Sequence, residues 1–137
     1  MNEVTVMDRG GTTPVLTEPV FFMHIAKTAG SFVNVLLQNA IGAPHVATHI
    51  ESKIGSSADL LRAYSSGVQV FSGHVMQGLW HDIAAPTELG FKKFTLLRDP
   101  IEHLASHLLW LDHYNRPEKR KEYVQLDESH RRISDRI

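Results

Sequence analysis

The sequence predicts an α/β fold in which a small parallel sheet is flanked by helices. Short apolar segments with β-branched and aromatic residues alternate along the chain with amphipathic segments of helical length, which is the pattern of strands joined by helices. Glycine, proline or a hydroxyl residue marks the boundaries between these segments. The composition agrees with a globular protein, because 42% of the 137 residues are hydrophobic and 21% are charged.

The chain begins with a polar lead-in and a first strand. Residues 1–19 are polar and contain two adjacent glycines and two prolines, so we expect a flexible lead-in followed by one domain over 20–137. The apolar run "PVFFMHI" over 19–25 predicts a short buried strand.

Two helices are expected next. "SFVNVLLQNAIG" over 31–42 ends at a glycine and is typical of an amphipathic helix with its stop signal. Its expected buried stripe consists of Phe32, Val35, Leu36 and Ile41. "SSADLLRAYSSG" over 56–67 predicts a second helix with Ser57 as its N-cap and Gly67 at its end. The intervening "HVATHIES" does not decide between helix and strand.

The second half repeats the alternation. "VQVFSGHV" over 68–75 predicts a second strand, "HDIAAPTELG" a connector, and "FKKFTLLRDP" over 91–100 a third strand that Asp99-Pro100 ends. The segment 101–114 predicts a helix with Pro100 in its first turn. Its expected buried face consists of Ile101, Leu104, Leu108 and Leu111. The charged sequence after Tyr114 indicates an exposed helix or a frayed tail.

Polar residues follow each of the three predicted strands. Lys27 to Ser31 follow the first strand, His74 follows the second, and Arg98 closes the third. Ligands of open parallel sheets bind at the carboxyl ends of the strands. The sequence therefore predicts that these residues serve one ligand-binding edge.

The segment "KTAGS" over 27–31 has the composition of an anion-binding turn. Backbone amides at a turn that opens a helix bind anions, and Lys27 adds a positive charge. The turn differs from the Walker sequence, in which the lysine follows the glycines, because here Lys27 precedes Gly30. The alternative for this segment alone is an ordinary surface lysine.

The segment "TLLRDPIEHLASH" holds a second candidate for an anion contact. Arg98 ends the predicted strand, and Ser106 lies eight residues later in the following helix. An arginine can hold a phosphate with two parallel hydrogen bonds, which a helix hydroxyl can supplement. The alternative is a scaffold role in which Arg98 pairs with Asp99 or Glu102.

Taken together, these segments resemble the sulfotransferase family. "HIAKTAGSF" resembles the loop that binds the 5'-phosphosulfate, "TLLRDPIEHLASHLLW" resembles the 3'-phosphate motif, and "FSGHVMQGL" resembles the Gly-His segment of carbohydrate sulfotransferases. The similarity covers residues 20 to about 112 and is greatest to the uronyl 2-O-sulfotransferase type and its short bacterial relatives. It departs from the usual pattern at Ala26, where a proline is common, and at Ala29 to Ser31, where Gly-Gly-Thr is common.

The resemblance implies a P-loop-like three-layer fold and a role for each matching residue. The donor co-substrate would be 3'-phosphoadenosine 5'-phosphosulfate, and the acceptor a hydroxyl of a small molecule or glycan. Lys27 would stabilise the leaving group, and Arg98 with Ser106 would hold the 3'-phosphate. The 5'-phosphosulfate would be bound by Lys27, Thr28, Ala29, Gly30, Ser31 and Phe32. His74 is the candidate general base, with a structural hydrogen bond at the strand end as its alternative.

Two other functions stay open at the level of sequence. Members of the family usually continue past the 3'-phosphate helix, so this chain also fits a minimal member that binds the nucleotide with little or no transfer. A P-loop nucleotide kinase is the second alternative, although neither a Walker lysine nor a clear magnesium-binding aspartate is evident.

Composition limits the remaining classes of function. The formal net charge of −1 gives no indication of binding to nucleic acid or to an anionic membrane. The absence of cysteine excludes disulfides and thiolate metal sites. Nine histidines include pairs spaced i, i+4, but the zinc sequence H-E-x-x-H is missing and we expect no metal. No signal peptide or run of about 18 apolar residues is evident, so we expect a cytoplasmic protein.

Overall fold

The computed structural model describes residues 15–75, 77–126 and 128–136. It contains a four-stranded sheet in the order β2-β3-β1-β4. The strands are β1 (Val20–Met23), β2 (Val46–Thr48), β3 (Val70–Gly73) and β4 (Lys92–Thr95). The two pairs β1–β3 and β2–β3 are parallel, with Val70 in register with both Val20 and Val46.

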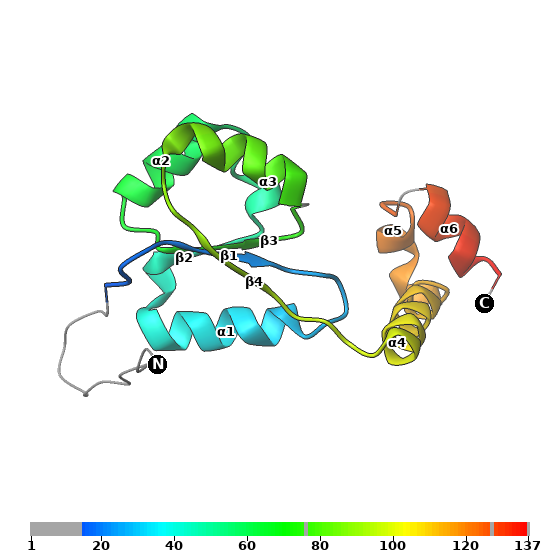
Figure 1. The fold of residues 1–137 in the computed structure, drawn as a ribbon. Coiled ribbons are helices and arrows are strands. Elements are labelled where there is room, and N and C mark those ends of the chain that lie inside the picture. The colour runs from blue at the N-terminus through cyan, green and yellow to red at the C-terminus, as the bar shows by residue number, and fades with distance from the viewer. Residues whose placement is uncertain (1–14, 76, 127, 137) are drawn as a thin grey trace. The chain divides into compact units, whose positions relative to one another are not determined.

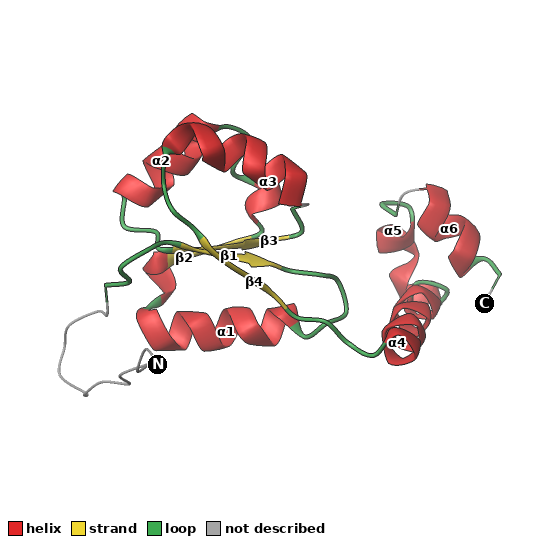
Figure 2. Cartoon of the chain, in the orientation of Figure 1, coloured by secondary structure: helices red, strands yellow, loops and turns green. Residues whose placement is uncertain are grey.

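Helices alternate with these strands, and the elements that follow β4 are all helical. They are α1 (Gly30–Ile41), α2 (Ser57–Ser65), α3 (Gln77–Ala84), α4 (Pro100–His113), α5 (Arg120–Tyr123) and α6 (Glu128–Ser134). Helix α1 covers one face of the sheet, and α2 and α3 cover the opposite face (Figures 1 and 2). The predicted three-layer α/β class with a small parallel sheet is confirmed.

The alternation of side chains along the strands builds a core on each face of the sheet. Phe21 and Phe71 point to the face of α2 and α3, where they pack with Leu60, Trp80 and other buried residues. Val70 points to the opposite face and packs with Ile41 of α1 and Val46 of β2. The central strands β1 and β3 are therefore buried on both faces, as in other sheets with helical crossovers, whereas β4 is largely exposed.

One buried hydrogen bond decides which side of α1 meets the sheet. Ser72 of β3 is fully buried, and its Oγ donates to Oδ1 of Asn34 at 2.6 Å. Burying two polar groups is tolerated when they bond to each other. Asn34, Leu37 and Ile41, spaced i, i+3 and i+7, thus form the inner side of α1.

The stripe predicted for α1 was wrong apart from Ile41. Phe32 is 63% exposed, and Val35 and Leu36 are about half exposed. The prediction ranked side chains by hydrophobicity, but the polar Asn34 is buried because Ser72 on the sheet forms a hydrogen bond with it. The face predicted for α4 is wrong at Ile101 and Leu104, which are exposed, and is confirmed at Leu111, which is buried.

Several predicted boundaries also change. Ser56 instead of Ser57 is the N-cap of α2, because its side chain accepts the backbone N–H of Asp59. The segment predicted as a connector begins inside α3, which ends at Ala84 before Pro86. Strand β4 ends at Thr95, so Arg98 lies in the following loop, and Asp99 is the N-cap of α4.

The described chain divides into two compact units. Of the described residues, the sheet unit comprises those within 15–23 and 31–94, and the helical unit those within 24–30 and 95–136. Among the described residues, no helix has both the length and the apolar character that a transmembrane segment needs.

The charged end of the chain is helical and is anchored to α4. Ser134 of α6 is fully buried, and its single hydroxyl hydrogen is shared between two acceptors, Asn115 Oδ1 at 2.7 Å from Oγ and the Leu111 carbonyl at 3.1 Å. The Tyr123 hydroxyl donates to Asp135 at 2.6 Å. The expected exposed helix is therefore held by a few buried anchors.

Candidate functional site

The loop that joins β1 to α1 has an unusual backbone. Lys27 and Ala29 both have φ of 64°, in the left-handed region that residues with a Cβ seldom adopt. Such conformations cost free energy and are concentrated at ligand-binding sites. The sequence gives no sign of them, because neither position is glycine or asparagine.

Internal contacts hold this loop. Thr28 is buried, and its hydroxyl donates to the Ile25 carbonyl at 2.7 Å, so this side chain supports the loop itself. A Cβ at Gly30 would collide with the His24 imidazole. Only glycine therefore allows His24 to lie against the first residue of α1.

Contacts from the region around α4 fix the same loop. The Ala26 carbonyl accepts the Nε2–H of His103 at 2.8 Å. The Lys27 carbonyl lies 3.5 Å from Nη1 of Arg98, which donates to it. Two donors on and before α4 thus hold successive carbonyls of the loop, 71 and 77 residues away in sequence.

A pocket of about 670 Å³ lies between this loop and α4 within the helical unit. Its charged and hydroxyl-bearing lining consists of Lys27, Arg98, Glu102 and Ser106. The rest of the lining is Ala105, Leu109, Trp110 and His113. The six lining residues from Glu102 to His113 recur at helical spacing and form one stripe along α4, and Arg98 lies in the loop just before this helix.

Three groups in the pocket have hydrogen-bonding capacity to spare. In the described ranges of the chain, neither the Lys27 ammonium nor the Ser106 hydroxyl makes a hydrogen bond or ion pair. Arg98 Nε pairs with Glu102 at 3.3 Å, which leaves other guanidinium N–H groups for a ligand. Arg98 thus pairs with Glu102, as the alternative scaffold role predicted, and it still has N–H groups that can contact an anion.

An aromatic cluster borders the charged end of the pocket. The Lys27 ammonium lies 5.8 Å from the Trp110 ring centroid, within the range of a cation–π contact. Tyr114 and His130 contact the Trp110 ring edge-to-face, and His107 contacts it at a tilt. Burial lowers the pKa of His107, and the charges of His130, His103 and Lys27 lower it further.

A separate polar cluster lies at the end of β3 in the sheet unit. The backbone N–H of His74 donates to Glu51 Oε2 at 3.0 Å, and Glu51 Oε1 lies 3.6 Å from His49 Nδ1. Burial alone would raise the pKa of Glu51, but the backbone amides of Glu51 and His74 and the two nearby imidazoles lower it. The His74 side chain is exposed.

The predicted site residues are thus only partly gathered in the pocket. Lys27, Arg98 and Ser106 line it together, whereas Thr28 is turned into the loop. Ala29 and Gly30 shape the loop backbone. Ser31 and Phe32 are exposed on the first turn of α1, and His74 belongs to the sheet unit.

The prediction did not name Leu109 or His113, and it gave Trp110 only as a core or pocket-lining residue. The signal for them was present in the spacing, because they follow Arg98 and Ser106 at intervals of three to four residues.

The structure keeps one of the two i, i+4 histidine pairs on a single helix and separates the other. His103 and His107 both lie on α4, whereas β2 separates His45 from His49. Within the described ranges, no group of three or more potential metal-ligating side chains is placed to hold an ion.

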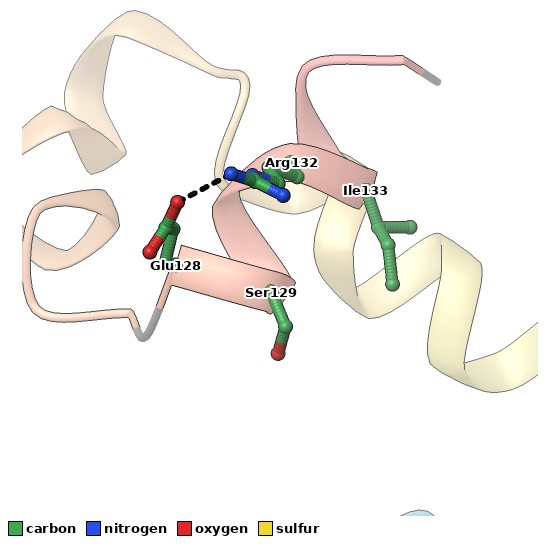
Figure 3. Close-up of a pocket in the computed structure, with 4 residues that line it drawn as sticks. All are labelled: Glu128, Ser129, Arg132 and Ile133. Atoms are coloured by element: carbon green, nitrogen blue, oxygen red, sulfur yellow. Dashed lines mark hydrogen bonds and ion pairs between the residues drawn. The ribbon is translucent and has the colours of Figure 1, made fainter.

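A second hollow of about 630 Å³ lies on α6 and is lined by Glu128, Ser129, Arg132 and Ile133. Figure 3 shows Arg132 joined to Glu128 across one turn, with Ser129 and Ile133 projecting elsewhere. The Arg132 guanidinium donates to Glu128 at 2.6 Å, so its charge is already neutralised. A single short helix supplies this lining, and the hollow is a feature of the surface of that helix.

Comparison of the chain with protein-family models, with curated proteins and with solved structures gave no match.

Proposed function

We propose that the protein binds 3'-phosphoadenosine 5'-phosphosulfate and transfers its sulfuryl group to a hydroxyl, with a small molecule or glycan as acceptor. The observation that carries the proposal is the pocket in which Lys27, Arg98 and Ser106 meet although the chain separates Lys27 from Arg98 by 71 residues. Two cations and a hydroxyl suit a ligand with more than one phosphate group.

The proposed reaction assigns a role to each of these groups. The acceptor oxygen forms a bond to sulfur as the bond between sulfur and the 5'-phosphate oxygen breaks. Lys27 stabilises the negative charge that develops on the departing 3',5'-adenosine bisphosphate, which is the main contribution that a protein makes in such transfers. The acceptor proton passes to a general base, for which His74 stays a prediction.

A binding protein without transfer is the second candidate. One observation favours it: all the residues that line the pocket belong to the helical unit, and the predicted base His74 is not among them. The pocket alone thus has the groups for binding, while transfer requires a base from outside that lining.

Calorimetry with 3',5'-adenosine bisphosphate tests the binding step. We expect Arg98→Ala to weaken binding at least tenfold, because the loss of a charge-assisted hydrogen bond costs about 1.5–3 kcal/mol. Arg116→Ala removes an exposed arginine outside the pocket and is the matched control, with unchanged affinity expected. Equal binding by both variants would refute the proposed site, and tighter binding of ATP-Mg would favour the kinase alternative.

A transfer assay separates the two candidates. If the protein is an enzyme, Lys27→Ala reduces turnover much more than it reduces affinity for the bisphosphate, because the lysine acts on charge that forms in the transition state. Binding of the bisphosphate with no transfer to any of a panel of sugar hydroxyl acceptors would favour the binding protein.

A further inference from the structure

The ammonium group of Lys27 lies against an aromatic ring, whereas the other lysine ammonium groups with described partners contact oxygen. Lys53 donates to a backbone carbonyl at 2.7 Å, and Lys92 and Lys119 lie 3.3 and 2.9 Å from carboxylate oxygens. Lys27 lies over the Trp110 ring instead, 5.8 Å from the ring centroid. The quadrupole of the ring attracts the cation, but the ring carries no negative charge that would neutralise it.

A contact of this kind suits a lysine that acts on an anionic ligand. A carboxylate partner would cancel the charge of Lys27 and take up some of its three N–H donors. A free lysine side chain, on the other hand, samples many rotamers, which a contact must restrict. The Trp110 ring restricts Lys27 and leaves its charge and donors to an anion in the pocket that both residues line.

The backbone of Lys27 is held independently of its side chain. Its φ is 64°, and its carbonyl accepts a hydrogen bond from Arg98 Nη1 at 3.5 Å. The preceding carbonyl accepts one from His103 Nε2 at 2.8 Å. Lys27 is thus restrained at both ends, by hydrogen bonds at its backbone and by the indole at its ammonium group.

The Trp110 ring is in turn oriented by its neighbours, one of which lies on α6. Tyr114 contacts the ring with planes 82° apart and centroids 5.1 Å apart, and His130 of α6 with planes 90° apart and centroids 6.0 Å apart. Edge-to-face contacts between aromatic rings are favourable and orient the rings. The bonds of Ser134 to the Leu111 carbonyl and to Asn115 hold α6 at this place.

Resting on the proposed function, we propose that Trp110 and His130 are positioning residues for Lys27. His130 fixes the plane of the indole, and the indole holds the ammonium group where negative charge forms on the departing bisphosphate. A charge that is in place before the reaction starts needs no reorganisation during it. The charged end of the chain thereby serves the reaction, although none of the described residues that line the pocket belongs to α6.

NMR of the free protein tests the geometry without any ligand. Protons above the face of an indole are shielded by its ring current, so the ε-methylene protons of Lys27 should resonate upfield of those of Lys121, an exposed lysine on α5. Trp110→Leu should remove this displacement, and Trp110→Phe should retain part of it. His130→Ala should reduce the displacement, and His130→Phe, which keeps a ring edge against the indole, should restore it.

Transfer kinetics test the role. We expect His130→Ala to lower kcat about twofold to fivefold, the value of an exposed cation–π contact, and to leave the affinity for 3',5'-adenosine bisphosphate within about twofold. In a Lys27→Ala background the same change should leave kcat unaltered, because no ammonium group is left to position. A merely structural His130 would lower kcat by the same factor in both backgrounds. The exposed His81→Ala on α3 is the control and should have no effect.

Three results would overturn the inference: ε-protons of Lys27 that coincide with those of Lys121, a displacement that survives Trp110→Leu, or an equal loss of kcat from His130→Ala with and without Lys27. If Trp110→Leu does not fold, Trp110→Phe and the two His130 variants still decide. Failure of the proposed function looks different. In that case the ring-current displacement persists, but the bisphosphate does not bind or binds equally to Arg98→Ala.

Discussion

Single residues in the loop over 24–30 carry conformations that the local sequence does not favour. Lys27 and Ala29 are left-handed, and this arrangement is maintained by hydrogen bonds to the carbonyls of Ala26 and Lys27. Left-handed backbone costs roughly 1–2 kcal/mol per residue with a Cβ. The hydrogen bonds from Arg98 and His103 therefore position Lys27 while the backbone keeps an unfavourable left-handed conformation.

The strain at Ala29 can be measured by substitution. We expect Ala29→Gly to leave the free energy of unfolding unchanged or to raise it by up to about 1 kcal/mol, because glycine adopts this conformation without a steric penalty. Ala105→Gly, within α4, is the matched control and should lower the free energy of unfolding by about 1 kcal/mol. Urea denaturation checks both, and an equal loss in the two variants would contradict strain at Ala29.

Gly73 controls the polar cluster at the end of β3. A Cβ there would collide with the Glu51 carboxylate and lie 2.7 Å from Ile50 Cγ1 and 3.0 Å from the Ile50 nitrogen. We therefore expect Gly73→Ala to lower the free energy of unfolding by about 1–3 kcal/mol. Thermal or urea denaturation measures this change.

Gly78 provides the matched control for Gly73. It lies within α3 with open space around the position of a Cβ. Gly78→Ala should raise the free energy of unfolding by about 0.5–1 kcal/mol, since alanine is the better helix former. A Gly73→Ala variant as stable as Gly78→Ala would show that the segment with Ile50 and Glu51 moves aside easily.

At the scale of elements, the packing of α1 on β3 depends on the bond between Asn34 and Ser72. Asn34→Ala leaves a buried serine hydroxyl without its acceptor, so we expect a loss of about 1–3 kcal/mol in the free energy of unfolding. Ser72→Ala should cost less when Asn34 is already absent. A double-mutant cycle measured by urea denaturation gives the coupling energy, and a value of zero would contradict the pairing.

Helix α4 both lines the pocket and anchors α6. Its stripe from Ser106 to His113 lines the pocket, while Leu111 is fully buried where Ser134 of α6 bonds to its carbonyl. Helical periodicity separates these two sides, because residues three and four apart share a face. The anchoring of α6 and the lining of the pocket thus depend on different residues of the same helix.

At the scale of the whole molecule, ligand binding should stabilise the two units unequally. With 3',5'-adenosine bisphosphate at 100 times its Kd, the folded form in which the pocket is intact is stabilised by about 2.7 kcal/mol relative to forms that do not bind the ligand. Hydrogen exchange should therefore slow in residues 24–30 and in α4. Arg98→Ala, with at least tenfold weaker binding, should reduce the gain to about 1.4 kcal/mol or less at the same ligand concentration, whereas Arg116→Ala should retain it. Protection confined to the sheet unit would contradict the proposed pocket.

Stability should also fall in mild acid because of His107. Its pKa is lower in the folded protein than the usual value of about 6.5, so the unfolded state binds the proton first. The contribution of neutral His107 is complete above pH 6.5 and is lost as the pH falls through the folded pKa. His107→Gln should reduce the slope of unfolding free energy against pH in this window, and the exposed His81→Gln on α3 should not.

Direct measurement of the titration completes this test. The imidazole shift of His107 followed by NMR should give a pKa below the usual value, and His130→Gln should raise it because one of the nearby charges is removed. A His107 that titrates at its usual value in the folded protein would remove the physical cause of the predicted slope.

The sequence by itself determined the α/β class, three of the four strands, helices α1, α2 and α4, and the segments that bring Lys27, Arg98 and Ser106 to the pocket. These features depend on neighbours along the chain: the apolar run of β1, the Asp99-Pro100 start of α4, and the spacing of Arg98 and Ser106. Helix α3 was missed because Pro86 was taken as evidence that the whole segment around it is a connector. Pro86 in fact lies beyond the end of this helix at Ala84.

Only the tertiary structure decided which faces are buried and which predicted residues meet. Asn34 faces the sheet because Ser72 offers it a hydrogen bond, and Thr28 turns inward because Ile25 offers it a carbonyl. Trp110 lines the pocket because α4 presents it on the same stripe as Ser106. Such choices depend on partners distant in the chain or on a loop conformation held by distant contacts, and local patterns of hydrophobicity do not contain them.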